Sequence, residues 1–248
     1  MNLHYIQKGN GDKTLVFLHY FGGAANTWND VIDCLQNNFT CIAVDLPGFG
    51  KSPALSHPIS VDDSTNAVIG LIENLKLQNY ILIGHSMGGK VAINAAAKNL
   101  KGLLQLILIA PSPPSPEPMT EKERENMLTA FGNEEDVKKM IQDVIANPLS
   151  DTLFLKEVNN NLQASQTGWQ SWPQLGSKEV IIDRMKGVHV PLSVLYGDKD
   201  KKFTKQFLKK EFNQYFTTFT LTEIENSGHL LPVEAPEATA TAIRKAVD

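Results

Sequence analysis

Short apolar runs recur along the chain, and they constrain its fold more than any other feature. They read TLVFLH (14–19), TCIAVD (40–45), YILIG (80–84), LLQLILIA (103–110) and PLSVLYG (191–197). Runs of this length, rich in aliphatic and β-branched residues and bounded by glycine or proline, are typical of strands buried on both faces of a sheet. Helix-like periodicity fills most of the intervals between them. Strands that alternate with helices predict a mainly parallel central sheet with helices on both faces.

Weaker patterns predict the edges of this sheet. Residues 3–7 alternate in polarity and precede the turn signal GNGDK, which predicts an edge strand in a hairpin. FTLTEI (219–224) is more polar than the other runs, which favours a position near an edge. The helices are predicted over residues 60–77, 87–99, 205–216 and 235–247.

One long interval interrupts the alternation of strands and helices. About 80 residues separate the run at 103–110 from the run at 191–197, and they begin with the proline-rich APSPPSPEP (110–118). Several helix-like stretches follow, which suggests helices inserted between two strands of one sheet. We therefore expect a core domain of residues 1–111 and 189–248 and a helical cap, or lid, of residues 112–188.

Size and charge exclude several classes of protein. The 248 residues suit one α/β domain, and the net charge of −4 offers no basic surface for nucleic acid or an anionic membrane. The two cysteines do not make a disulfide framework. The N-terminus lacks a secretory signal pattern, and no apolar run reaches the roughly 18 residues that span a bilayer. We expect a soluble, cytoplasmic protein without nucleic-acid partners or membrane insertion; the oligomeric state is left open.

The pentapeptide GHSMG (84–88) places Ser86 between a predicted strand and a predicted helix. In the pattern G-x-S-x-G, a sharp turn at this junction exposes the serine hydroxyl at the carboxyl edge of the sheet. The flanking glycines leave room where a side chain would clash. Ser86 is therefore a candidate nucleophile.

A serine hydroxyl needs a base to take its proton and a carboxylate to orient that base. His229 lies in NSGHLLPVEAPE, after the last predicted strand and before the final helix. Two carboxylates, Asp198 and Asp200, follow the strand at 191–197. Serine, aspartate and histidine thus occur in the order expected of this architecture.

These pieces together resemble the α/β-hydrolase family, in particular its small, cap-bearing serine hydrolases of the carboxylesterase type. The matching segments are LVFLHYFGG (15–23), DLPGFGKS (45–52), GHSMGG (84–89), LYGDKD (195–200) and GHLLPVEAP (228–236). The resemblance implies Ser86 as nucleophile, His229 as general base and Asp200 as the acid of the triad. Asp198 stays open as an alternative, because the spacing is a family pattern and not a chemical necessity.

The resemblance also implies an oxyanion hole made of two backbone N–H groups. One is expected from Met87, which follows the nucleophile at a helix N-terminus. The other maps to Phe21 in the loop after the strand at 14–19. Tyr20 stands in this loop where a glycine is common in the family.

The expected activity is hydrolysis of carboxylic esters of small or medium acyl chains through an acyl-enzyme, with no cofactor. Lactone hydrolysis, carbon–carbon bond cleavage and perhydrolysis share the same triad and stay open. A small-molecule receptor with little or no turnover is the alternative from another class. Tyr20, Trp169 and Trp172 are the candidate pocket residues. No cluster of histidine, cysteine and aspartate has metal-ligand spacing, so no metal is expected.

Overall fold

The computed structural model describes residues 1–247; residue 248, the last of the predicted core domain, lies outside the described residues. Its strands are β1 (Tyr5–Lys8), β2 (Thr14–Leu18), β3 (Thr40–Val44), β4 (Tyr80–His85), β5 (Leu103–Ile109), β6 (Leu192–Gly197) and β7 (Thr220–Ile224). They form one sheet in the order β1-β3-β2-β4-β5-β6-β7. All neighbouring strands are parallel except β1 and β3.

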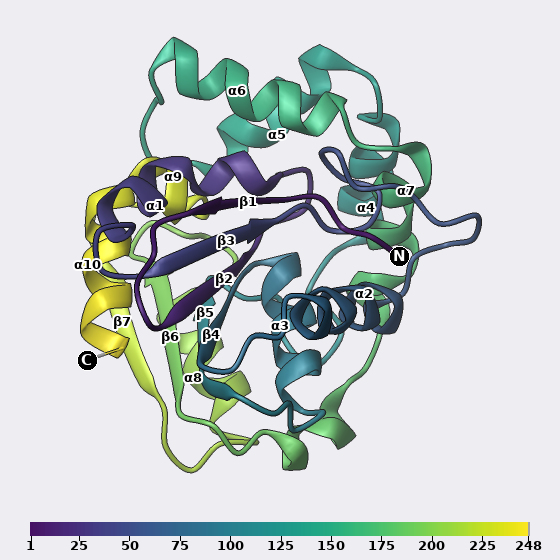
Figure 1. Cartoon of the computed structure of the whole chain (residues 1–248). Helices are drawn as coiled ribbons and strands as arrows, with labels where there is room; N and C mark the ends of the chain where they lie inside the picture. The colour runs from purple at the N-terminus through teal and green to yellow at the C-terminus, as the bar shows by residue number, and fades with distance from the viewer. Residues whose placement is uncertain (248) are drawn as a thin grey trace.

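Helices cover both faces of this sheet, with α2 and α3 on one side and α1 and α10 on the other (Figure 1). Outside the segment between β5 and β6, the helices are η1 (Ala25–Trp28), α1 (Asn29–Leu35), α2 (Val61–Asn74), α3 (Met87–Ala96), α8 (Lys205–Phe212), α9 (Leu231–Glu234) and α10 (Pro236–Val247). The predicted fold class is therefore confirmed.

The predicted strands agree with the observed ones, and β1 and β7 lie at the two edges as expected. The hairpin prediction for β1 is wrong. This strand pairs antiparallel with β3, with Tyr5 opposite Val44, because β2 already has β3 on one side and β4 on the other.

Three of the four predicted helices end earlier in the structure than predicted, at Asn74, Ala96 and Phe212, and one helical segment is absent from the predictions. Lys76 and Asn99 have φ values of 52° and 53°, a left-handed conformation that ends α2 and α3. The unpredicted segment, residues 25–35, buries Trp28, Val31 and Ile32. These positions follow helical spacing, but the preceding glycines and asparagines obscure the pattern.

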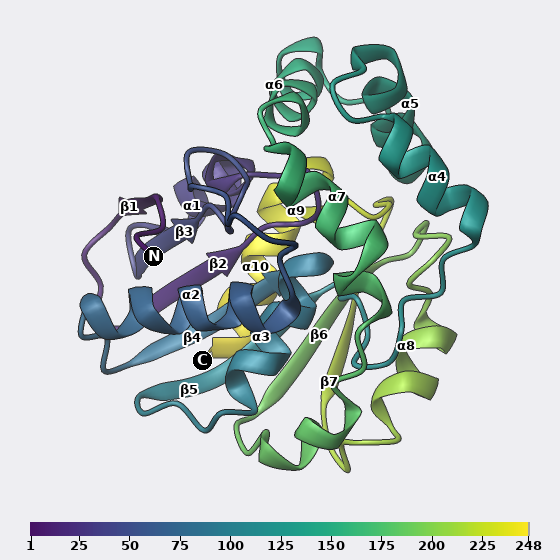
Figure 2. The ribbon, with the colours of Figure 1, turned by 90° about the vertical axis from the view of Figure 1, so that its right-hand side faces the viewer.

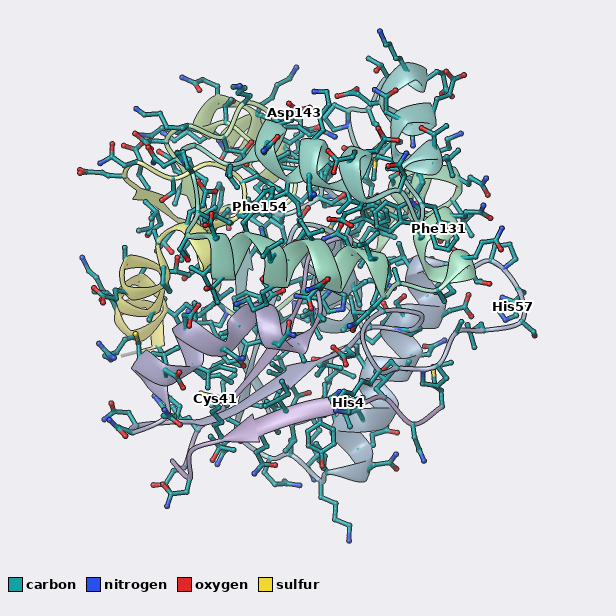
Figure 3. All side chains as sticks on the ribbon, turned by 90° about the horizontal axis from the view of Figure 1, so that it is seen from above. His4, Cys41, His57, Phe131, Asp143 and Phe154 are labelled. Carbon is teal, nitrogen blue, oxygen red and sulfur yellow. The ribbon has the colours of Figure 1, made fainter. Side chains whose placement is uncertain are left out.

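The segment between β5 and β6 is helical and lies beyond the carboxyl edge of the sheet (Figure 2). It contains α4 (Glu121–Thr129), α5 (Glu134–Val144), α6 (Asp151–Leu162), α7 (Gln166–Gln174), η2 (Gly176–Lys178) and η3 (Ile182–Gly187). Seen from above, α5 and α6 run side by side, with Asp143 on α5 and Phe154 on α6 (Figure 3). We refer to residues 112–188 as the insertion; its action as a separate cap stays a prediction.

A buried lysine holds both ends of the insertion to α3. The ammonium of Lys90 donates to the carbonyl of Ser115 at 3.0 Å and to that of Glu179 at 2.6 Å. Burial lowers the pKa of Lys90 to about 8, although nearby carboxylates act in the opposite direction. Since the two carbonyls lie at opposite ends of the insertion, one side chain fixes where the chain leaves and re-enters the core.

The turn from β4 into α3 depends on close backbone approach at Gly88. A Cβ atom there would lie 2.6 Å from the carbonyl oxygens of Leu18 and His19, at the end of β2. Both oxygens belong to the backbone and cannot turn away, so glycine is required where the helix crosses the loop after β2.

We predict opposite effects of alanine at two helical glycines. Gly88→Ala lowers the free energy of unfolding by about 2–4 kcal/mol, because the methyl group overlaps fixed backbone. Gly70→Ala, in the interior of α2 with no atom within 4 Å of an added Cβ, raises it by about 0.5–1 kcal/mol. Urea unfolding of both variants checks this; equal stability of the two would contradict the close-approach argument.

Candidate active site

Ser86 occupies a strained turn between β4 and α3. Its φ of 51° and ψ of −116° lie outside the regions that L-residues favour, at a cost of about 1–3 kcal/mol. The backbone holds this conformation from both sides: the Ser86 N–H donates to the Ile109 carbonyl, and the Ser86 carbonyl accepts from the N–H of Ser112, each at 3.0 Å. The strain presents the hydroxyl at the carboxyl edge of the sheet.

The three residues predicted as a triad lie in one hydrogen-bonded chain. Ser86 Oγ is 2.9 Å from His229 Nε2, and His229 Nδ1 is 2.8 Å from Asp200 Oδ2. Because an ionised carboxylate only accepts hydrogen bonds, Nδ1 carries the proton and donates it to Asp200. The lone pair of Nε2 then faces the serine hydroxyl, which is the arrangement that proton removal requires.

Asp200 is held as a carboxylate. Burial raises its pKa, but the charge and hydrogen bond of His229 and two backbone N–H groups outweigh this effect and lower the pKa to about 2. Those N–H groups, of Lys202 and Phe203, donate to Oδ1 at 2.8 and 3.0 Å. Asp200 is therefore a charged carboxylate over the whole pH range in which a neutral histidine can act as a base.

The alternative acid, Asp198, lies away from His229. Its Oδ1 accepts from the N–H of Ser227 at 3.2 Å, and its Oδ2 pairs with the ammonium of Lys199 at 2.8 Å. The structure thus brings Asp200, not Asp198, against the imidazole.

The loop that carries His229 contacts the insertion directly. The backbone N–H of His229 donates to the carbonyl of Val144, the last residue of α5, at 2.8 Å. Glu234 Oε2 accepts from the N–H of Gly228 at 2.9 Å and from that of Ala146 at 2.6 Å. The histidine loop and the end of α5 are therefore joined by hydrogen bonds, directly and through Glu234.

Two further histidines support the site without facing the serine. His85 Nε2 donates to the carbonyl of His229 at 2.8 Å. Burial lowers the pKa of His85 well below its usual range, and a positive charge on His229 when that imidazole is protonated lowers it further. His19 donates through Nδ1 to the Tyr20 carbonyl and accepts through Nε2 from the Leu46 N–H; burial lowers its pKa as well. Both histidines are neutral, and each holds the backbone of a neighbouring loop by hydrogen bonds.

The two predicted oxyanion donors are unpaired. Within residues 1–247, neither the N–H of Phe21 nor that of Met87 donates to another group. Met87 is the first residue of α3, where an N–H has no partner inside the helix and the helix dipole favours negative charge. The ring of Phe21 is 4.6 Å from that of Trp169, which fixes the loop after β2.

Tyr20 binds this loop to the insertion. Its hydroxyl donates to Glu157 Oε2 on α6 at 3.1 Å, and the same oxygen accepts from Thr27 Oγ1 at 2.9 Å and Asn160 Nδ2 at 3.2 Å. Glu157 is fully buried. A tyrosine at this position therefore supplies one of the donors that a buried carboxylate needs.

A cavity of about 460 Å³ opens above Ser86. Apolar and charged side chains both line it. The uncharged lining residues include Tyr20, Phe21, Met119, Asn126, Met127, Met140, Ile141, Ile145, Asn161, Trp172, Phe203 and Leu230, and the charged ones include Lys199, Lys201, Lys202, Glu117, Glu123 and Asp143. The predicted pocket residues Tyr20 and Trp172 lie in this wall.

Trp169 does not line this cavity, contrary to the prediction. It is fully buried behind Phe21, and its indole N–H donates to the carbonyl of Met127 at 2.5 Å. An indole whose polar atom is bonded inside the insertion supports the wall from behind and does not face a ligand.

Three residues that contact the site are missing from the sequence predictions: Glu157, Asn161 and Glu234. Glu157, Asn160 and Asn161 are three and four positions apart, so they share one face of α6. Polar residues at this spacing on the buried face of a helix are a pattern that could have indicated Glu157 and Asn161 from the sequence. Glu234 carries no comparable pattern.

Family membership rests on the sequence as a whole. The model of the alpha/beta hydrolase family matches residues 15–242. The chain belongs to the alpha/beta hydrolase family. Its curated relatives include the uncharacterized hydrolase YugF of Bacillus subtilis (strain 168), 24% identical over 256 residues that cover 96% of this chain and 91% of that protein. The family and this relative support hydrolase activity.

Solved structures share this fold over nearly the whole chain. An esterase (EaEST) from Exiguobacterium antarcticum matches with a TM-score of 0.90 at 21% identity, covering 99% of this chain and 96% of that one. An enol-lactonase from Burkholderia xenovorans LB400 matches with a TM-score of 0.86 at 19% identity, again over 99% and 96%. At these identities the similarity establishes the fold alone.

Residues 1–247 contain no group of three histidine, cysteine or acidic side chains placed to hold a metal ion. Nor does any helix in that range have the length and apolarity to cross a membrane.

We predict that Tyr20→Phe lowers the free energy of unfolding by about 1–2 kcal/mol, because the buried carboxylate of Glu157 loses a hydrogen-bond donor. Tyr215→Phe is the matched control: its hydroxyl has no hydrogen bond within residues 1–247, so the change stays within about 0.5 kcal/mol. Chemical denaturation measures both; equal effects would contradict the role given to the Tyr20 hydroxyl.

Proposed function

We propose that the protein hydrolyses carboxylic esters of small or medium acyl chains through an acyl-enzyme on Ser86. The observation that carries this proposal is the hydrogen-bonded chain of Ser86, His229 and Asp200, with distances of 2.9 and 2.8 Å, at the base of a cavity of about 460 Å³. A cavity of this size suits a small organic substrate.

In the acylation half, His229 Nε2 takes the proton of the Ser86 hydroxyl while Oγ bonds to the acyl carbon. The carbonyl oxygen becomes an alkoxide, and the free N–H groups of Phe21 and Met87 stabilise it. When the tetrahedral intermediate collapses, the bond to the alcohol oxygen breaks and His229 returns the proton to that oxygen. Asp200 stabilises the imidazolium throughout.

In the deacylation half, water replaces the alcohol. His229 takes a proton from the water as its oxygen bonds to the acyl carbon, and the same N–H groups again hold the alkoxide. The bond to Ser86 Oγ then breaks, and His229 returns the proton to the serine. The carboxylic acid leaves, and no electron carrier or metal enters this cycle.

The insertion serves in this proposal as the cap of residues 112–188, because it supplies most of the cavity wall above Ser86. The same catalytic groups suit the ring ester of a lactone, and the enol-lactonase of the same fold supports that second candidate. The free cysteines Cys34 and Cys41 agree with a cytoplasmic location.

The decisive experiment measures release of nitrophenol from para-nitrophenyl esters of increasing acyl length, with Ser86→Ala as the blank. We expect many turnovers per protein molecule and loss of at least about a thousandfold in the variant, because no other group accepts the acyl chain. Ligand binding without turnover would instead identify a receptor that retains the triad.

A second variant pair tests the acid. Asp200→Asn lowers kcat by about a thousandfold or more, because an amide neither holds the proton on Nδ1 nor stabilises the imidazolium. Asp198→Asn, at the same loop but bonded to Lys199, keeps kcat within about threefold. Similar losses in the two variants would refute the assignment of Asp200.

A further inference from the structure

Asn161, on α6 of the insertion, is the one amide side chain of the cavity wall that is almost fully buried, at 4% exposure, among residues 1–247. Its Nδ2 donates to the Glu157 carbonyl at 2.8 Å and approaches the Tyr20 hydroxyl oxygen at 3.4 Å. Both amide hydrogens are thereby used inside the protein.

This network fixes the orientation of the amide. The Tyr20 hydroxyl donates its proton to Glu157, so towards Asn161 it offers only lone pairs. A flipped amide would set the Asn161 oxygen against two acceptors, the hydroxyl and the Glu157 carbonyl. Asn161 Oδ1 therefore points the other way, to Gly22 in the loop after β2.

Gly22 makes room for this oxygen. Its φ is +85°, and a Cβ atom there would overlap Asn161 Oδ1. Within residues 1–247, Oδ1 accepts no hydrogen bond, although the asparagine lines the cavity. Oδ1 is not among the fully buried atoms of this part of the chain that lack a partner, so this oxygen is reached from the cavity that Asn161 lines. An open acceptor on an otherwise buried side chain is a position where a hydrogen-bond donor of a bound substrate can be held.

The proposed mechanism decides which part of the substrate meets Asn161. His229 protonates the leaving alcohol, so the alcohol lies on the side of His229 and Phe203. We place the acyl chain on the side of the loop after β2, because Tyr20 and Phe21 of that loop line the cavity and Asn161 contacts Tyr20.

From this geometry we infer that Asn161 is a specificity-determining residue whose Oδ1 accepts a hydrogen bond from a hydroxyl group on the acyl chain, close to the reacting carbonyl. The preferred substrates are then esters of α- or β-hydroxy acids. This inference rests on the proposed function, since it assigns the substrate class of the same site.

The test compares kcat/KM for para-nitrophenyl α-hydroxybutyrate and β-hydroxybutyrate with that for para-nitrophenyl butyrate. The ratio of hydroxylated to plain ester is measured in the wild type and in Asn161→Leu, because the intrinsic reactivity of each ester cancels between variants. We expect the ratio for at least one hydroxy ester to fall about tenfold in Asn161→Leu. Asn161→Ala serves if the leucine variant fails to fold.

Asn126→Leu is the matched control. Asn126 lines the same cavity from α4 but is exposed, so the same substitution there leaves the ratio unchanged within about twofold. Ratios in Asn161→Leu and Asn161→Ala equal to the wild type, with hydrolysis intact, would overturn the inference and leave the proposed function standing.

A binding measurement separates the two proposals. In Ser86→Ala, the dissociation constants of methyl β-hydroxybutyrate, methyl α-hydroxybutyrate and methyl butyrate are compared with and without Asn161→Leu. A preference for a hydroxy ester that disappears in the double variant supports the inference even if the wild type hydrolyses no ester, an outcome that would refute only the proposed function. Equal binding of all three esters would refute the inference.

Discussion

The parallel pairing of β4 between β2 and β5 is the constraint on which the rest of the structure depends. Because the three strands run in the same direction, their carboxyl ends reach one edge of the sheet together. The turn at Ser86 is held by the backbone of Ile109, the last residue of β5, and of Ser112 just after it. The helix that follows the turn lies against the carbonyls at the end of β2. The strain of the serine is thus maintained by its two neighbouring strands.

The insertion holds in place the loops and the helix that carry the site at the edge of the sheet. It contacts the loop after β2 through Glu157, the histidine loop through Val144, and α3 through Lys90. Two of these contacts, those of Glu157 and Lys90, are made by fully buried side chains, where a missing partner is costly. The insertion therefore supports the geometry of the nucleophile, the base and the oxyanion loop as well as enclosing the cavity above them.

Much of the fold could be predicted because its signals are local. Apolar runs and helical periodicity locate the strands and most helices, and Ser86, His229 and Asp200 each follow a recognisable strand. The hairpin at β1 was mispredicted because strand pairing is a non-local choice. Glu157 and Tyr20 are 137 positions apart, and no spacing rule connects them. The distinction between Trp172 in the wall and Trp169 behind it likewise depends on side-chain direction, which a sequence pattern does not carry.

The hydrogen bond from the His229 N–H to Val144 also bears on how the chain folds. Residues 144 and 229 come from the insertion and from the C-terminal part of the chain, with β6, α8 and β7 between them. In the folded protein the His229 N–H has its partner on α5, so the final shape of the histidine loop depends on α5 being docked. Because this contact joins segments far apart in the sequence, we expect a newly made chain to acquire a competent base only after its insertion is in place.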